Sequence, residues 1–264
     1  MAESVTTLAV LRRRIASLEG APAAKACARV ATGHAPVDQA LQGGFARGRL
    51  HELFGRVEDE GAAVGLGLIL AHLAAGDAPL FWLRGGGKAT AQAYGPGLVA
   101  LGLDPTKLLI GMMASEALLL QAAADALRCP ALGALVIELR GRAPLLDLTA
   151  SRRLALAAEA SGVTALLLRV AAEPAPSTAE TRWIVRAAHS PPGNSSSAWG
   201  APMFDAQLVR NRHGPVGRWI MEWKCDECLF VEPSAYPQPV AAAPAHRPHQ
   251  AVHSVFKRSG YRFA

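Results

Sequence analysis

The fold of this chain is decided by residues 49–75, RLHELFGRVEDEGAAVGLGLILAHLAA. The apolar residues up to Phe54 predict a short buried strand, and the residues from Gly55 to Gly61 predict a turn. Ala62–Ala75 is apolar on nearly every side, which predicts a helix buried against a sheet. A strand, a glycine-bounded turn and a helix form the phosphate loop of a nucleotide-binding α/β domain, but they also form ordinary structural units that bind nothing.

The turn lacks the side chains of a working phosphate loop, G-x-x-x-x-G-K-[ST]. In that loop, backbone N–H groups cradle the phosphates, the lysine neutralises their charge and the hydroxyl holds magnesium. Here Gly55 and Gly61 are one residue too far apart, and Ala62 and Ala63 stand where the lysine and the hydroxyl residue belong. The turn is filled by three consecutive carboxylates, residues 58–60, which would repel a triphosphate.

The composition predicts a soluble protein with one large domain. The chain has 264 residues, 51% of them hydrophobic and 6% aromatic, so alanine and leucine supply most of the core. A formal charge of +6 permits a nucleic-acid or acidic partner. The four cysteines are too few and too unevenly placed for a disulfide framework, which favours a reducing cytoplasm. The N-terminus does not resemble a signal peptide, and the longest apolar run, residues 62–75, is too short to span a bilayer.

We expect three parts: an N-terminal amphipathic helix in residues 1–24, a core domain in residues 25–232 and a flexible tail in residues 233–264. In the first part, Val5–Leu18 has apolar residues at helical spacing around three arginines. Such a helix docks on its own domain, on a second copy or on a partner. The tail is rich in Pro, Ala, His and Arg and ends with aromatic residues among cations, so it is a short binding motif or a plain disordered terminus.

Apolar strands alternate with helices along the first two thirds of the chain. The predicted strands are 28–31, 79–83, 107–111, 133–139 and 163–168, and the predicted helices are 37–41, 94–101, 115–128 and 147–161. Ser115 and Asp147 are placed to cap two of these helices, and Gly162 to end the last. In helix 115–128, the apolar face is predicted to consist of Leu120, Ala123, Ala124 and Leu127. Continuous apolar strands between helices indicate a parallel sheet covered on both faces.

The pattern changes after residue 180. Residues 181–187, 204–211 and 217–223 alternate between apolar and polar, which predicts antiparallel strands with one wet face, and the last two form a hairpin. Cys225 and Cys228 have the spacing of half a zinc site, but no second pair of ligands accompanies them. A redox pair would begin a helix, whereas this pair follows a strand. We interpret it as a structural turn.

Several phrases together resemble a known family. Residues 31–55, ATGHAPVDQALQGGFARGRLHELFG, are similar to the start of the ATPase core of RecA-type recombinases, and the later strands through residues 207–223, QLVRNRHGPVGRWIMEW, follow the order of that core. More narrowly, residues 11–20, LRRRIASLEG, and residues 225–230, CDECLF, resemble the ImuA family, RecA-like accessory proteins of bacterial inducible mutagenesis. The resemblance covers roughly residues 5–232.

The resemblance implies an α/β fold: a RecA-like core with a mostly parallel sheet flanked by helices and with antiparallel strands at its C-terminal end. It makes Gly55, Gly61, Ala62 and Ala63 a vestigial phosphate loop. The acid that orients the attacking water in recombinases would fall in residues 84–87, where no carboxylate exists.

Only Glu138 could serve as a vestigial Walker B acid, unless it is simply a charge emerging at a strand end. One acid cannot organise phosphoryl transfer. We therefore expect no catalytic residue, no cofactor and no metal site.

The two connections in the place of RecA's DNA-binding loops are predicted not to grip DNA in the same way. Residues 140–146 and 171–180 stand where RecA carries mobile DNA-binding loops, and both are short and rich in proline and alanine. Arginines elsewhere could form an electrostatic surface or lie scattered on solvated faces. These are Arg140, Arg142, Arg152, Arg153, Arg210, Arg212 and Arg218.

Three functions remain open. The first is a non-catalytic accessory protein that recruits partners in damage-induced translesion synthesis. The resemblance implies as partners an ImuB-type protein similar to Y-family polymerases, an error-prone replicative-type polymerase subunit and RecA, with a homo-oligomer as a further alternative. The second is an ATPase in which Lys88 or a neighbouring subunit's arginine replaces the lost lysine. The third is a nucleic-acid binder acting through arginines and the tail. The first is the function we expect.

Overall fold

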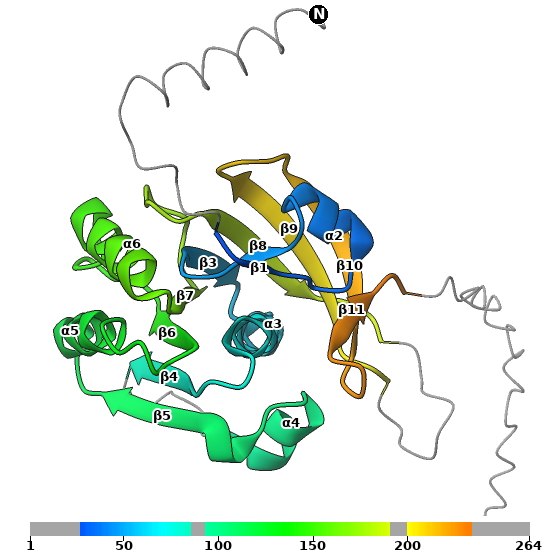
Figure 1. Cartoon of the computed structure of the whole chain (residues 1–264), viewed down its shortest axis with the longest axis horizontal. Helices are drawn as coiled ribbons and strands as arrows, with labels where there is room; N and C mark the ends of the chain where they lie inside the picture. The colour runs from blue at the N-terminus through cyan, green and yellow to red at the C-terminus, as the bar shows by residue number, and fades with distance from the viewer. Residues whose placement is uncertain (1–26, 86–92, 191–199, 234–264) are drawn as a thin grey trace, which may run out of the picture. The chain divides into compact units, whose positions relative to one another are not determined.

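The computed structural model describes residues 27–85, 93–190 and 200–233 (Figure 1). The predicted helix at residues 5–18, Lys88 and the predicted tail from residue 234 onward lie outside the described residues. Within the described ranges, no helix is long and apolar enough to cross a membrane.

A nine-stranded sheet forms the centre of the fold (Figure 1). Its strands are β3 (Leu50–Gly55), β4 (Leu80–Gly85), β5 (Leu108–Met113), β6 (Ala134–Arg140), β7 (Thr164–Val170), β8 (Thr181–Ala187), β9 (Met203–Asn211), β10 (Gly217–Lys224) and β11 (Leu229–Val231). They lie in the order β11-β10-β9-β8-β3-β7-β6-β4-β5. Neighbours from β8 to β5 are parallel, and neighbours from β8 to β11 are antiparallel.

The mostly parallel sheet flanked by helices, with an antiparallel end, confirms the predicted α/β architecture, with two corrections. Strand β8 was expected to be wholly antiparallel, but it is parallel to β3, with His51 opposite Thr181, and antiparallel only to β9. It alternates because only one of its faces is covered by the core, and that pattern does not reveal strand direction. The short edge strand β11 was not predicted, because three residues carry too little periodicity.

Helices cover both faces of the parallel strands (Figure 1). The helices are α2 (Ala35–Ala40), α3 (Glu60–Ala75), α4 (Gly95–Ala100), α5 (Glu116–Ala126), α6 (Leu148–Ser161) and the 3-10 turn η1 (Pro105–Lys107). Helix α3 lies on one face, while α5 and α6 lie on the other. A separate two-stranded sheet joins β1 (Arg29–Val30) to β2 (Phe45–Ala46).

Helix α3 is the centre of the larger apolar layer. Leu66, Leu68 and Ile69 are buried although they point in different directions around the helix, as its continuous apolar sequence predicted. Gly67 faces β7, where an added Cβ would lie only 2.5 Å from the Leu168 side chain. The glycine therefore lets the helix axis approach the sheet closely.

The caps of α5 and α6 agree with the sequence prediction. The Ser115 hydroxyl accepts a hydrogen bond from the Leu118 N–H at 3.3 Å, and the Asp147 carboxylate accepts one from the Ala150 N–H at 2.7 Å. Gly162 ends α6 with a φ of +81°.

The predicted buried face of α5 was partly wrong. Its fully buried row is Leu119, Ala123 and Leu127, whereas the predicted Leu120 and Ala124 are half-buried. Residues four apart form that row, so its centre is one position away from the predicted face.

A buried histidine links β3 to its neighbours. His51 stacks on Phe45 at 3.8 Å between ring centroids, and its Nε2 lies 2.8 Å from the Ala46 carbonyl oxygen. A carbonyl only accepts, so Nε2 carries the proton and Nδ1 accepts from the Thr181 hydroxyl at 2.7 Å. Trp183 donates to the same hydroxyl at 2.9 Å. Burial is the largest cause lowering the pKa of His51 to about 4.

Candidate functional site

The candidate site is the turn between β3 and α3. The helix begins at Glu60, two residues earlier than predicted, so only residues 56–59 connect the two elements. The Asp59 N–H donates to the Arg56 carbonyl at 3.1 Å, and the Ala63 N–H donates to the Asp59 carbonyl at 3.0 Å. The predicted turn from Gly55 to Gly61 was therefore too long, because its last two residues already belong to the helix.

The predicted loop residues have different structural roles. A Cβ on Gly55 would lie 2.6 Å from the Ala63 Cβ, so packing of strand against helix requires glycine there. Gly61 is exposed, and a Cβ on it would meet no atom within 4 Å. Ala62 is half-buried, and Ala63, which also belongs to α3, is buried in the core. Position 63 thus faces the core rather than the turn.

The carboxylates of the turn bind neighbouring strands. Asp59 accepts a hydrogen bond from the Ala187 N–H at 2.9 Å, and Glu60 forms an ion pair with Arg140 at the end of β6. Glu58 lies 3.7 Å from Arg56 on the surface. The acidic side chains therefore tie the start of α3 to the ends of β6 and β8, on the side where an anion would have to enter.

The Glu138 carboxylate is buried and hydrogen-bonded in the interior of the protein. Only 5% of the residue is exposed, and its carboxylate accepts hydrogen bonds from Trp82 Nε1 at 2.9 Å, Arg84 Nε at 2.9 Å and Arg84 Nη2 at 3.3 Å. The Arg84 guanidinium also lies 4.4 Å from the centre of the Trp82 ring. The alternative of a charge emerging at a strand end was wrong, because Arg84 and Trp82 enclose the carboxylate.

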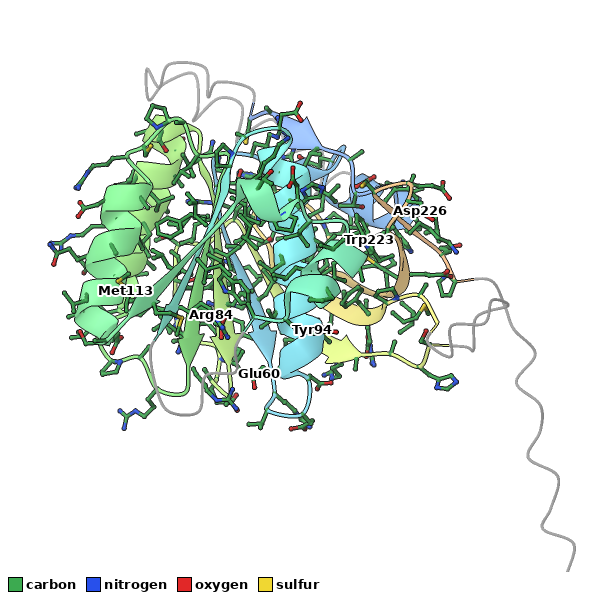
Figure 2. The ribbon with its side chains drawn as sticks, turned by 90° about the horizontal axis from the view of Figure 1, so that it is seen from below. Glu60, Arg84, Tyr94, Met113, Trp223 and Asp226 are labelled. Carbon is green, nitrogen blue, oxygen red and sulfur yellow. The ribbon has the colours of Figure 1, made fainter. Side chains whose placement is uncertain are left out.

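Arg84 itself occupies the region where the family pattern places the water-orienting acid. It lies directly opposite Glu138 in the register of β4 and β6, and only 6% of it is exposed. Figure 2 labels Arg84 and Glu60 near the end of the sheet where the parallel strands finish. A cation stands where the recombinase pattern has a carboxylate, and it binds Glu138, the residue that the resemblance aligns with the Walker B acid. The sequence showed no acid there but gave no sign of this pairing.

A cavity of about 440 Å³ lies beside the turn. Phe54, Gly55 and Ile184 contribute to its walls, and Arg56 and Arg186 stand with Glu58 and Glu173 around it. Of the predicted loop residues, it includes Gly55 but not Gly61, Ala62 or Ala63, and Glu138 does not line it either. The described structure therefore does not gather the predicted site residues around this cavity. Arg186, on an alternating strand, was not singled out from the sequence.

The connection after β6 is anchored to the helices. Glu116 accepts hydrogen bonds from the N–H groups of residues 145 and 146 at 2.9 and 3.1 Å. Arg169 is buried, and its Nη2 donates to the Gly141 carbonyl at 3.2 Å. Both ends of the connection are therefore held against the body.

The connection after β7 is held in the same way. Arg210 donates to the Ser177 carbonyl at 2.7 Å, and Arg182 donates to the Ser177 hydroxyl at 3.0 Å. The Thr178 N–H donates to the Ser151 hydroxyl at 3.2 Å. These bonds fix residues that the resemblance aligns with a mobile DNA-binding loop.

The arginines singled out from the sequence do not form one surface. Arg140 pairs with Glu60 at one end of the parallel strands, whereas Arg212 follows β9 at the opposite end. Arg218 donates two hydrogen bonds to Asp205, at 2.7 and 2.5 Å, and these are the largest cause lowering the pKa of Asp205. Residues 1–26 carry a net +2 and residues 234–264 a net +4, so the two ends of the chain account for the whole formal charge.

The Cys225–Cys228 segment forms a turn between β10 and β11, as predicted. The Cys225 thiol donates to the Ala100 carbonyl at 2.9 Å, and burial is the largest cause raising its pKa. Figure 2 labels Asp226, which lies within this turn. Among the described residues, no three His, Cys, Asp or Glu side chains gather closely enough to hold a metal.

Comparison with known proteins supports the resemblance read from the sequence. No family model matches the chain. Over 142 residues, the chain is 33% identical to Protein ImuA of Caulobacter vibrioides strain NA1000/CB15N, and the same identity holds for strain ATCC 19089/CIP 103742/CB 15. The chain is ImuA-like. The similarity covers 50% of this chain and 57% of ImuA, so the chain spans little more than half the length of the curated relatives it matches.

Proposed function

We propose that this chain is a non-catalytic, RecA-like accessory protein of damage-induced mutagenesis and that it acts through protein contacts. The similarity to ImuA supports the cellular process at the level of the family. The strand–turn–helix of residues 50–75, followed by a parallel sheet with an antiparallel end, supports the RecA-like core. Cytoplasmic location belongs to the same proposal.

The observation that carries the proposal is that the acidic side chains near the turn already bind other groups of the protein. Glu138 is bound by Arg84 and Trp82, while Asp59 and Glu60 bind neighbouring strands. Phosphoryl transfer needs a cradle of free amides, a cation and a metal-binding acid directed at the same point. Here the acids stabilise the fold, and the first turn of α3 carries Ala62 and Ala63 where a lysine and a hydroxyl residue would be needed.

Because the arrangement does not suit phosphoryl transfer, the activity that we propose is recruitment of partner proteins. We propose an ImuB-type protein and an error-prone polymerase subunit as partners, with RecA and a second copy of the chain as further ones. Residues 27–233 have no net formal charge, because residues 1–26 and 234–264 together account for the whole +6 of the chain. Any contact with DNA is therefore weak or indirect for the body itself.

Complementation tests the proposed process. In Caulobacter vibrioides lacking ImuA, expression of this chain is expected to restore damage-induced mutation frequency. An empty vector serves as the control. A mutation frequency equal to that of the empty vector, with the chain present at normal abundance, would contradict the proposal.

A Gly61→Ala variant tests the non-catalytic role in the same assay. Because Gly61 is exposed in the first turn of α3 with no neighbour near its Cβ, the variant is expected to be as stable as the parent, or more stable by up to about 1 kcal/mol. Its mutation frequency should match that of the parent. A functional phosphate loop would not tolerate this change, so a stable variant without activity would favour the ATPase alternative. Gly55→Val, which clashes with Ala63, serves as the contrasting destabilised variant.

A further inference from the structure

Large apolar side chains on one side of α6 are exposed to solvent. Leu148 is 53% exposed and Leu156 is 56% exposed, and Arg152 lies between them at the same four-residue spacing. The buried row of the helix is a different one, formed by Ser151, Leu154 and Ala158. The exposed row therefore does not serve the core, and its four-residue spacing places the three side chains on one side of the helix.

This side of α6 borders a cavity of about 340 Å³. Arg152 and Leu156 form part of the helix wall, and the opposite wall includes Arg49 at the start of β3, Thr178 before β8 and Arg212 after β9. We call this cavity, together with Leu148, the α6 groove. It lies at the end of the parallel strands opposite to the turn between β3 and α3, so it is separate from the candidate site described above.

Among the described residues, two arginine side chains of the α6 groove have no acidic partner. Glu159 is paired with Arg49 at 2.7 Å, and the nearly buried Glu180 lies 3.4 Å from His213. In the part of the chain that the structure describes, the side chains of Arg152 and Arg212 make no hydrogen bond or ion pair. Both are exposed, and they stand on opposite walls. A ligand in the groove would meet the exposed Leu156 and two guanidinium groups, while Glu159 and Glu180 in the same lining already lie against other cationic or imidazole groups.

We propose that the α6 groove binds an acidic amphipathic helix of a partner protein. Apolar side chains of such a helix would contact Leu148 and Leu156, and its carboxylates would pair with Arg152 and Arg212. Guanidinium groups beside exposed leucines favour carboxylates by charge and by geometry. The inference rests on the proposed recruitment function and assigns it a surface.

Charge distinguishes this occupant from the chain's own segments. Residues 1–26 hold four cationic and two acidic side chains, and residues 234–264 hold four cationic side chains and no acidic ones. Either segment would bring cations to Arg152 and Arg212. A second copy docking through the same face would place these arginines near their own counterparts. An acidic helix from another protein is the occupant that the charges favour.

Binding of a defined peptide tests the groove. The probe is a fluorescent synthetic helix of about 18 residues with leucines on one face and glutamates on the other, titrated with the full chain by anisotropy. We expect binding that weakens as salt rises and that falls more than about tenfold in Arg152→Glu/Arg212→Glu. Leu156→Ser is also expected to weaken it. Arg153→Glu, which changes an exposed arginine of α6 that does not line the cavity, is the matched control and should bind within about twofold of the parent.

The following results of the binding and mass measurements would overturn the proposal. One is no binding of the glutamate peptide. Another is equal binding of a peptide with lysines in place of the glutamates. The third is equal loss in Arg153→Glu and the groove variants. A change in mass by light scattering in the double variant, without peptide binding, would assign the groove to a second copy and also reject the proposal.

The complementation assay separates the two claims. If the parent restores mutagenesis and the double groove variant does not, the groove is supported. If both restore it, the groove inference fails while the proposed function stands. If the parent itself fails, the proposed function falls, and the peptide titration still decides the groove.

Discussion

Replacing Arg84 with alanine is expected to lower the free energy of unfolding by about 3–5 kcal/mol. Both Arg84 and Glu138 have side chains only 7% exposed, and their atoms approach to 2.9 Å. Removal of the arginine leaves the carboxylate buried without its cation, although Trp82 Nε1 still donates a hydrogen bond to it. An unpaired charge in the interior is far more costly than the loss of a surface ion pair. Urea denaturation followed by tryptophan fluorescence measures the change.

A double variant provides the control for this prediction. In Arg84→Met/Glu138→Leu both charges are absent, so most of the lost stability should return. Arg128→Ala removes the exposed ion pair with Asp125, and its stability should be close to that of the parent. If Arg84→Ala is no less stable than Arg128→Ala, Glu138 is not structurally anchored, and the assignment of this acid to the fold is wrong.

Acid is expected to destabilise the protein through His51. Its folded-state pKa is about 4, against 6.5 for an ordinary histidine, because burial disfavours the charged ring. Arg29 and Arg49 lower it further. Between pH 6.5 and about pH 4, the His51 ring is protonated in the unfolded chain but neutral in the folded chain. The contribution of His51 is therefore complete above pH 6.5 and falls by about 3 kcal/mol as the pH drops to about 4.

A His51→Gln variant isolates this effect. It should be less stable than the parent at pH 7, but it should lose less stability between pH 6.5 and pH 4, with a difference of about 3 kcal/mol between the two profiles. His34 and His72, whose pKa values burial also lowers, are present in both proteins and cancel in the comparison. Parallel profiles for the parent and His51→Gln would refute the role given to His51.

Local patterns predicted most of the elements because each carries its own signal. Asp147 and Gly162 bound α6 as a cap and a left-handed stop, and their chemistry is local to the chain. The apolar strands around Ile137 and Leu167 could be assigned to a covered parallel sheet because both faces of each strand are buried. The direction of β8 was missed because alternation reports burial and not strand direction.

The site was harder to predict because its contacts join distant residues. Glu138 was identified, but its binding by Arg84 depends on the register of β4 and β6, which sequence does not give. The turn at Asp59 was predicted too long because helix α3 starts with residues that also suit a turn. The α6 groove was not predicted, since Leu156 and Leu154 have the same chemistry and only the fold decides which of them is exposed.

Calorimetric titration of the full chain with ATP and magnesium tests the central claim most directly. If the turn at residues 56–59 and the Arg84–Glu138 pair belong to the fold, as their hydrogen bonds indicate, no saturable binding heat should appear even with nucleotide in large excess. A saturable, magnesium-dependent isotherm that is lost in Glu138→Gln would contradict the account and restore the ATPase alternative.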